Sequence, residues 1–135
     1  MKKLMISRSV PLIICGLLLA GCRSPVPVQL TAADVGRSVD LRLGQEIEAR
    51  LEANPTTGYR WEMVHAAPAV FDVLAGQVYS PAPSAPRTVG GGGMVTWRFR
   101  AARPGHDSLH MVYRRPWEPD SPSAQTFNCD VTVRP

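Results

Sequence analysis

The chain has 135 residues, a length that suits one domain, and its formal net charge is +4 at pH 7. Lys2, Lys3 and Arg8 supply three of the positive charges and no acidic residue lies before position 22, so +4 − 3 leaves +1 for the rest of the chain. This near-neutral balance excludes the strongly basic surface with which many proteins bind nucleic acid, and we expect no nucleic-acid partner.

The first 21 residues have the organisation of an export signal. The positive residues precede an apolar run at 10–20, which is too short to span a bilayer as a helix. The run ends in Leu19-Ala20-Gly21-Cys22, which resembles the bacterial lipobox, where the cysteine is lipidated and becomes the new N-terminus. We therefore predict a lipoprotein signal peptide at 1–21 and lipidation of Cys22. The alternative is an ordinary secretory signal that leaves Cys22 free.

Residues 22–36 are small, polar and rich in proline, which predicts a tether between the lipid and a folded domain at 37–135. A lipid anchor predicts a protein held at a membrane of the cell envelope. The residue after Cys22 is Arg23 and not an aspartate. By resemblance to the sorting of Gram-negative lipoproteins, this suggests the outer membrane, on its periplasmic or surface side. With Cys15 removed and Cys22 lipidated, Cys129 has no partner for a disulfide within the chain, so a hydrophobic core must stabilise the domain.

Short runs in which apolar and polar residues alternate follow one another along the domain. They lie at 39–43, 46–53, 59–64, 94–102, 109–114 and 127–133, with a less regular run at 71–79. The glutamate-rich run at 46–53 could form a short helix by propensity, but its strict period of two favours a strand. Turn residues separate the runs. We therefore predict an all-β fold, an antiparallel β-sandwich of about seven strands.

A stiff loop is predicted at 54–59, between two of these strands. Asn54-Pro55 is a turn starter, because proline fixes φ and has no N–H to donate. Thr56 and Thr57 are β-branched and stiff at χ1. Gly58 permits a positive φ or the close approach of another group. Taken alone, such a stretch is more often a structural turn between two strands.

Two further loops accompany the first. The run Gly90-Gly91-Gly92-Gly93 leads into the strand at 94–102, and Arg115-Pro116-Trp117 follows the strand at 109–114. Together the three loops resemble the chagasin-type inhibitors of papain-like cysteine peptidases, which carry Asn-Pro-Thr-Thr-Gly-Tyr/Phe-x-Trp, Gly-x-Gly-Gly and Arg-Pro-Trp motifs in this order. The matching positions are Asn54, Pro55, Thr56, Thr57, Gly58, Tyr59 and Trp61; Gly90, Gly92 and Gly93; and Arg115, Pro116 and Trp117.

The resemblance extends from about Val35 to the C-terminus and implies an immunoglobulin-like sandwich. It implies a monomeric, reversible and tight-binding inhibitor of papain-like cysteine peptidases, without enzymatic activity. It also implies that the loop at 54–59 covers the catalytic cysteine of the peptidase, with the two threonines nearest to it. Gly90–Gly93 would lie along the groove on one side and Arg115–Trp117 on the other. The alternative function is a structural or ligand-binding envelope lipoprotein with the same fold.

The cysteine and histidine residues of the domain could in principle carry catalysis or bind a metal. Cys129 shares a strand face with apolar residues, which indicates a buried position rather than a nucleophile. The three histidines are scattered and have no acidic or cysteine partner at ligand spacing, so we predict no metal site and no cofactor. Trp61 and Trp97 are predicted to lie in the core. Trp117 follows a proline in a polar loop, which favours an exposed binding residue.

Overall fold

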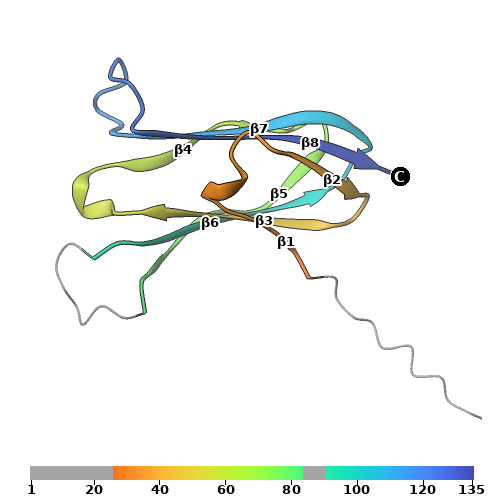
Figure 1. Ribbon diagram of the computed structural model, residues 1–135, viewed down its shortest axis with the longest axis horizontal. Coiled ribbons are helices and arrows are strands. Elements are labelled where there is room, and N and C mark those ends of the chain that lie inside the picture. The colour runs from red at the N-terminus through yellow and green to blue at the C-terminus, as the bar shows by residue number, and fades with distance from the viewer. Residues whose placement is uncertain (1–25, 84–90) are drawn as a thin grey trace, which may run out of the picture.

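Two four-stranded sheets pack face to face in the computed structural model, which describes residues 26–83 and 91–135. The sheets have the strand orders β1-β3-β6-β5 and β2-β8-β7-β4, and Figure 1 shows them as two layers. The strands are β1 (Val28–Leu30), β2 (Ser38–Arg42), β3 (Glu46–Ala53), β4 (Arg60–Ala66), β5 (Phe71–Pro81), β6 (Gly93–Ala101), β7 (Gly105–Arg114) and β8 (Gln125–Arg134). Two short 3-10 turns, η1 (Ala32–Asp34) and η2 (Pro55–Thr57), complete the elements.

The core lies between the two sheets, where the apolar residues of the alternating runs meet. Ile47 and Leu51 of β3 and Phe99 of β6 face Leu109 of β7 and Phe127 of β8, and all five side chains are fully buried. Alternation in the sequence places such residues on one face of each strand, so burying that face dictates the sandwich. The predicted all-β sandwich is confirmed.

Where the alternation of apolar and polar residues is regular, it correctly predicts which large side chains are buried. Trp61 and Trp97 are both buried, as predicted. The less regular run at 71–79 belongs to one edge strand, β5, whose pairing with β6 shifts register after Val73 and again after Ala75. These irregularities interrupt the period of two, and Val73 on this edge strand is exposed.

Two features of the sheets differ from the sequence prediction. The structure has eight strands rather than about seven, because Val28–Leu30 pairs with β3 and buries Leu30. The folded unit therefore begins before the predicted boundary at residue 37, within the stretch assigned to a tether. This strand was missed because a run of three residues is too short to show an alternation of apolar and polar residues. In addition, β1 pairs with β3 and β2 pairs with β8 in parallel, so the sheets are not purely antiparallel.

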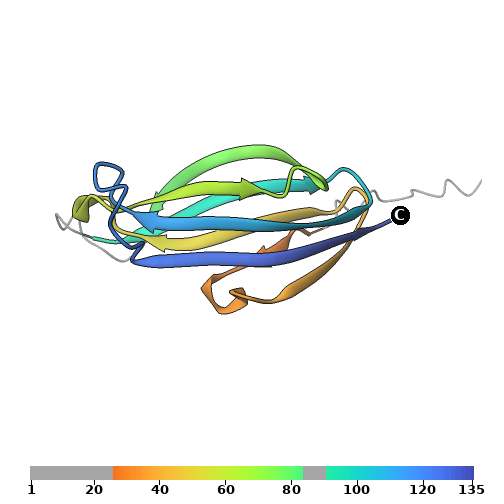
Figure 2. The ribbon, with the colours of Figure 1, turned by 90° about the horizontal axis from the view of Figure 1, so that it is seen from above.

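The antiparallel order of the central strands brings the three predicted loops to one end of the sandwich. Ala53 at the end of β3 pairs with Gly93 at the start of β6, and Arg60 at the start of β4 pairs with Arg114 at the end of β7. Figure 1 shows this end on the left, with the C-terminus at the opposite end, and Figure 2 shows from above that the strands run lengthwise between the two ends.

Several predicted features lie outside the described residues: the signal peptide at 1–21, the lipidated Cys22, and Gly90 of the glycine run. Within residues 26–83 and 91–135, the structure contains no helix of the length and apolar character needed to cross a membrane.

Candidate functional site

The loop between β3 and β4 is a compact turn closed by its own hydrogen bonds. The Oδ1 atom of Asn54 accepts a hydrogen bond from the Thr56 backbone N–H at 3.2 Å and another from the Thr56 hydroxyl. The Asn54 carbonyl accepts from the Thr57 N–H at 3.2 Å, and the Pro55 carbonyl accepts from the Gly58 N–H at 3.1 Å. Gly58 ends the turn with a φ of +80°, which the sequence had allowed for. The turn therefore holds its shape without help from a partner protein.

Aromatic side chains connect this turn to the neighbouring strands. The Asn54 backbone N–H donates a hydrogen bond of 2.9 Å to the hydroxyl of Tyr113 on β7. The ring centroid of Tyr113 lies 5.4 Å from that of Tyr59 and 5.1 Å from that of Trp61. The indole N–H of Trp61 donates to the carbonyl of Glu52 at 2.9 Å. The bond to Tyr113 attaches the first loop to β7, and the bond of Trp61 joins the start of β4 to the end of β3.

The loop after β7 packs directly against the first loop. The guanidinium carbon of Arg115 lies 4.7 Å from the ring centroid of Tyr59, a cation–π geometry. The side chain of Trp117 lies over Gly58: a Cβ atom at Gly58 would be 2.4 Å from Cη2 of Trp117. Trp117 nevertheless keeps 64 % of its surface exposed, which confirms its predicted exposure. The absence of a side chain at Gly58 therefore makes room for the indole.

The register of β4 and β7 explains why these two loops meet. Arg60 and Arg114 are the outermost paired residues of the two strands. Tyr59 directly precedes Arg60, and Arg115 directly follows Arg114. Gly58 and Trp117 lie one and two residues further from this pair, respectively. The contacts between the loops thus continue an antiparallel pairing past its last strand residues. As a result, the first and third motifs form one continuous surface, which we call the joined loops (54–59 and 115–117).

The glycine run is described from Gly91 onward and lies beside the start of the first loop. At Gly93, a Cβ atom would be 2.4 Å from the carbonyl oxygen of Ser80 and 2.7 Å from the ring of Tyr79, so this glycine is required by the packing of β6 against β5. At Gly92, a Cβ atom would lie 3.6 Å from the carbonyl oxygen of Ala53. Gly92 therefore keeps the surface next to the first loop free of side chains.

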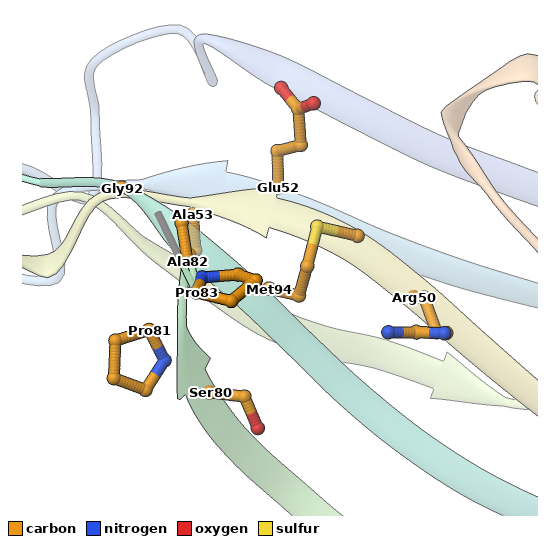
Figure 3. Close-up of a pocket in the computed structure, with 10 residues that line it drawn as sticks. Arg50, Glu52, Ala53, Ser80, Pro81, Ala82, Pro83, Gly92 and Met94 are labelled. Atoms are coloured by element: carbon orange, nitrogen blue, oxygen red, sulfur yellow. The ribbon is translucent and has the colours of Figure 1, made fainter. Parts of the chain in front are cut away.

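An open pocket of about 510 Å³ adjoins the glycine run on the outer face of the β3-β6-β5 sheet (Figure 3). Pro81 and Pro83 line one part of it, Met94 lies between, and Arg50 and Glu52 of β3 line the other part. Among the residues that the structure describes, no group of His, Cys, Asp or Glu side chains is arranged to hold a metal ion.

Cys129, the candidate nucleophile, and His65 both make contacts that stabilise the fold. Cys129 is buried in the core, as predicted, and burial raises the pKa of its thiol to about 11, so the thiol stays protonated at neutral pH. The ring of His65 lies 2.8 Å from the carboxylate of Asp107, which also accepts the backbone N–H of Ala69 at 3.0 Å. The hydrogen bond from Ala69 holds the pKa of Asp107 below its ordinary value. This contact ties the β4–β5 connection to β7, away from the loops.

The sequence of this chain is similar to those of known proteins. Residues 40–131 match the sequence profile described as chagasin family peptidase inhibitor I42. The chain belongs to this family. It is similar to amoebiasin-1 from Entamoeba histolytica, with 29% identity over 107 residues that cover 79% of this chain and 100% of amoebiasin-1. It is also similar to chagasin from Trypanosoma cruzi, with 26% identity over 102 residues that cover 73% of this chain and 91% of chagasin.

The fold is shared with a solved structure, that of the cysteine protease inhibitor EhICP2 from Entamoeba histolytica. The two superpose with a TM-score of 0.72 at 20% sequence identity, over 79% of this chain and 95% of EhICP2. This likeness shows a chagasin-like sandwich. The predicted family, and with it an inhibitor that is not an enzyme, is confirmed.

In this chagasin-family chain the structure brings most of the predicted site residues together. Asn54–Tyr59 and Arg115–Trp117 are in contact, and Gly92 and Gly93 lie beside them. Tyr113 was missed by sequence reasoning, because its inward position on β7 looks like that of any core residue. The spacing Tyr-x-Arg-Pro-Trp, which puts Tyr113 two residues before Arg115, is the signal that could have pointed to it.

Proposed function

We propose that this chain inhibits papain-like cysteine peptidases by docking the loop end of its sandwich into the active-site cleft. The observation that supports this most strongly is Trp117, which is largely exposed yet packs against Gly58. Exposed aromatic residues held in one orientation are frequent hot spots of protein interfaces. Because the joined loops are ordered before binding, docking costs little conformational entropy, which favours tight and reversible inhibition.

In this proposal each motif has its own place in the cleft. Thr56 and Thr57, at the tip of the turn, lie over the catalytic cysteine of the peptidase. The glycine run lies along the groove on one side, where the absence of side chains permits main-chain contact. Trp117 lies on the other side of the turn and packs against the enzyme surface. The grouping of the three loops at one end of the sandwich supports this arrangement.

The internal bonds of the turn explain how the loop could enter the cleft without being cut. A cysteine peptidase must place a substrate carbonyl against its nucleophile and oxyanion hole. The carbonyl of Asn54 already accepts hydrogen bonds from the N–H and the hydroxyl of Thr57, at 3.2 and 2.7 Å. The carbonyl of Pro55 already accepts from Gly58. Attack on the Asn54–Pro55 or the Pro55–Thr56 peptide bond would therefore require the turn to open, so we expect these two peptide bonds to remain uncut.

The test is a titration of papain with the chain from residue 22 onward, carrying Cys22→Ser so that no lipid is attached. We expect residual activity to fall linearly with added inhibitor to a one-to-one end point and to return on extensive dilution. Gel electrophoresis after prolonged incubation should show an uncut chain. Activity that is unchanged at a large excess of folded protein would refute the proposal and leave the envelope lipoprotein function.

We also propose that Cys22 carries a lipid that anchors the chain to the outer membrane. The supporting observation is the lipobox-like sequence at 19–22. Since β1 begins at Val28, five residues separate Cys22 from the first strand, and the six steps from Cys22 to Val28 span about 22 Å at most when fully extended. Val28 pairs with Ile47 near the start of β3, so the chain enters the sandwich at the end opposite the loops. An anchored domain would thus lie close to the membrane with its loops directed away from it.

Expression of the full chain in a Gram-negative host tests the anchor. The wild-type protein should fractionate with the outer membrane, and the Cys22→Ser variant should be soluble in the periplasm. Detergent-free vesicles bearing the wild-type protein on their outer surface should inhibit added papain, because the loops face outward. Equal solubility of the two proteins would refute lipidation.

A further inference from the structure

We infer that Tyr113 is a positioning residue for inhibition, which sets the geometry of the first loop from within the fold. The inference rests on the proposed function. Tyr113 is only 8% exposed, so the sandwich covers it from solvent and from a docked peptidase. Its hydroxyl accepts the backbone N–H of Asn54 at 2.9 Å across the gap between β7 and the first loop.

The place of Asn54 in the turn makes this bond important. The side-chain amide oxygen of Asn54 accepts the N–H of Thr56, and its carbonyl accepts the N–H of Thr57. These bonds fix the internal shape of the turn, but they join loop atoms to loop atoms. The bond to Tyr113 instead joins the first residue of the turn to β7, the strand that continues into Arg115 and Trp117. It therefore sets the position of Thr56 and Thr57 relative to Trp117.

The rings around Tyr113 allow its hydroxyl to be tested separately from its packing. The Tyr113 ring contacts Tyr59 and Trp61, with centroid distances of 5.4 and 5.1 Å, and Tyr59 in turn lies under the guanidinium of Arg115. A Tyr113→Phe substitution keeps this aromatic cluster and removes the hydrogen bond alone. A change in inhibition by this variant would therefore report the anchoring of Asn54.

The fraction of molecules in the docking geometry determines how much Tyr113→Phe weakens inhibition and which rate constant it changes. A hydrogen bond of this kind changes an equilibrium by about 3- to 10-fold. If the anchored loop geometry is the one that docks, its loss lowers the fraction of competent molecules by up to this factor, and the apparent inhibition constant rises in the same proportion. Once the complex has formed, the peptidase itself holds the loop. We therefore expect the association rate to fall and the dissociation rate to change less than twofold.

The experiment compares wild type, Tyr113→Phe and Tyr79→Phe. Tyr79 lies at the same end of the sandwich, and within the described part of the chain its hydroxyl makes no hydrogen bond to the loop, so it provides a matched control. Papain association and dissociation rates are measured for each protein, together with hydrogen exchange of the Asn54 amide. We expect Tyr113→Phe to lower the association rate by up to about 10-fold and to speed exchange at Asn54, and Tyr79→Phe to do neither.

The outcomes separate this inference from the proposed function. If the wild-type protein does not inhibit papain, the proposed function fails, and the exchange rate at Asn54 still tests the anchor. If the wild-type protein inhibits and Tyr113→Phe has unchanged rates, the positioning role is wrong. A rise confined to the dissociation rate, with unchanged exchange at Asn54, would also overturn it, because it would indicate a direct contact between Tyr113 and the enzyme.

Discussion

Replacing Gly58 with alanine adds a single methyl group at the point where the joined loops touch. Two consequences follow from the structure. The backbone at Gly58 has a φ of +80°, a left-handed conformation that alanine rarely adopts. The new methyl group would also lie 2.4 Å from Cη2 of Trp117, about 1 Å short of the 3.4 Å at which ordinary contact begins. The indole must therefore move away from the first loop.

The two consequences affect different measurements. The left-handed conformation costs a residue other than glycine about 1–2 kcal/mol, which in a domain of this size lowers the melting temperature by about 4–8 °C. Displacement of Trp117 affects inhibition. An aromatic hot spot contributes about 2 kcal/mol, so we expect the papain inhibition constant to rise by up to about 30-fold.

Gly44→Ala provides the matched control. Gly44 has a φ of +87°, and a Cβ atom there meets nothing within 4 Å. It lies in the turn between β2 and β3, at the end of the sandwich away from the loops. This variant should lose a similar amount of stability and inhibit papain as well as wild type. If Gly58→Ala also inhibits as well as Gly44→Ala, the contact between Gly58 and Trp117 does not contribute to binding. In the Trp117→Ala background, Gly58→Ala should raise the inhibition constant much less than it does alone.

Three further substitutions are tested by the same two measurements, the inhibition of papain and the stability of the fold. Trp117→Ala should raise the papain inhibition constant by about 30-fold with little change in melting temperature, because most of the side chain is exposed; an unchanged constant would exclude it as an anchor. Thr56→Arg should keep the fold and weaken inhibition more than Thr56→Ala does, because a large side chain at the tip of the turn would clash with the cleft. Equal inhibition by Thr56→Arg and wild type would show that the turn does not enter the cleft. Cys129→Ala should lower the free energy of unfolding by about 1 kcal/mol through loss of a small buried group and leave inhibition intact, whereas a folded variant without inhibition would revive a role for the thiol.

Much of this protein could be predicted from local features of its sequence. The period of two in runs such as 46–53 and 94–102 identified the strands, because a sandwich buries one face of each strand. The Asn54-Pro55 pair and Gly58 identified a turn in which Gly58 permits a positive φ, since these conformations depend on the residues themselves. The polar, proline-containing surroundings of Trp117 identified it as exposed.

The tertiary structure decided which of these features meet. A period of two shows which face of a strand is buried, but it does not show the partner strand, its direction or its register. The parallel pairings of β1 and β2 were therefore missed, and Val28–Leu30 was assigned to a tether. The contact of Trp117 with Gly58 and the hydrogen bond from Asn54 to Tyr113 join residues 59 positions apart in the chain. Both depend on the pairing of Arg60 with Arg114, which is fixed by burying the apolar faces of β4 and β7 in a common core.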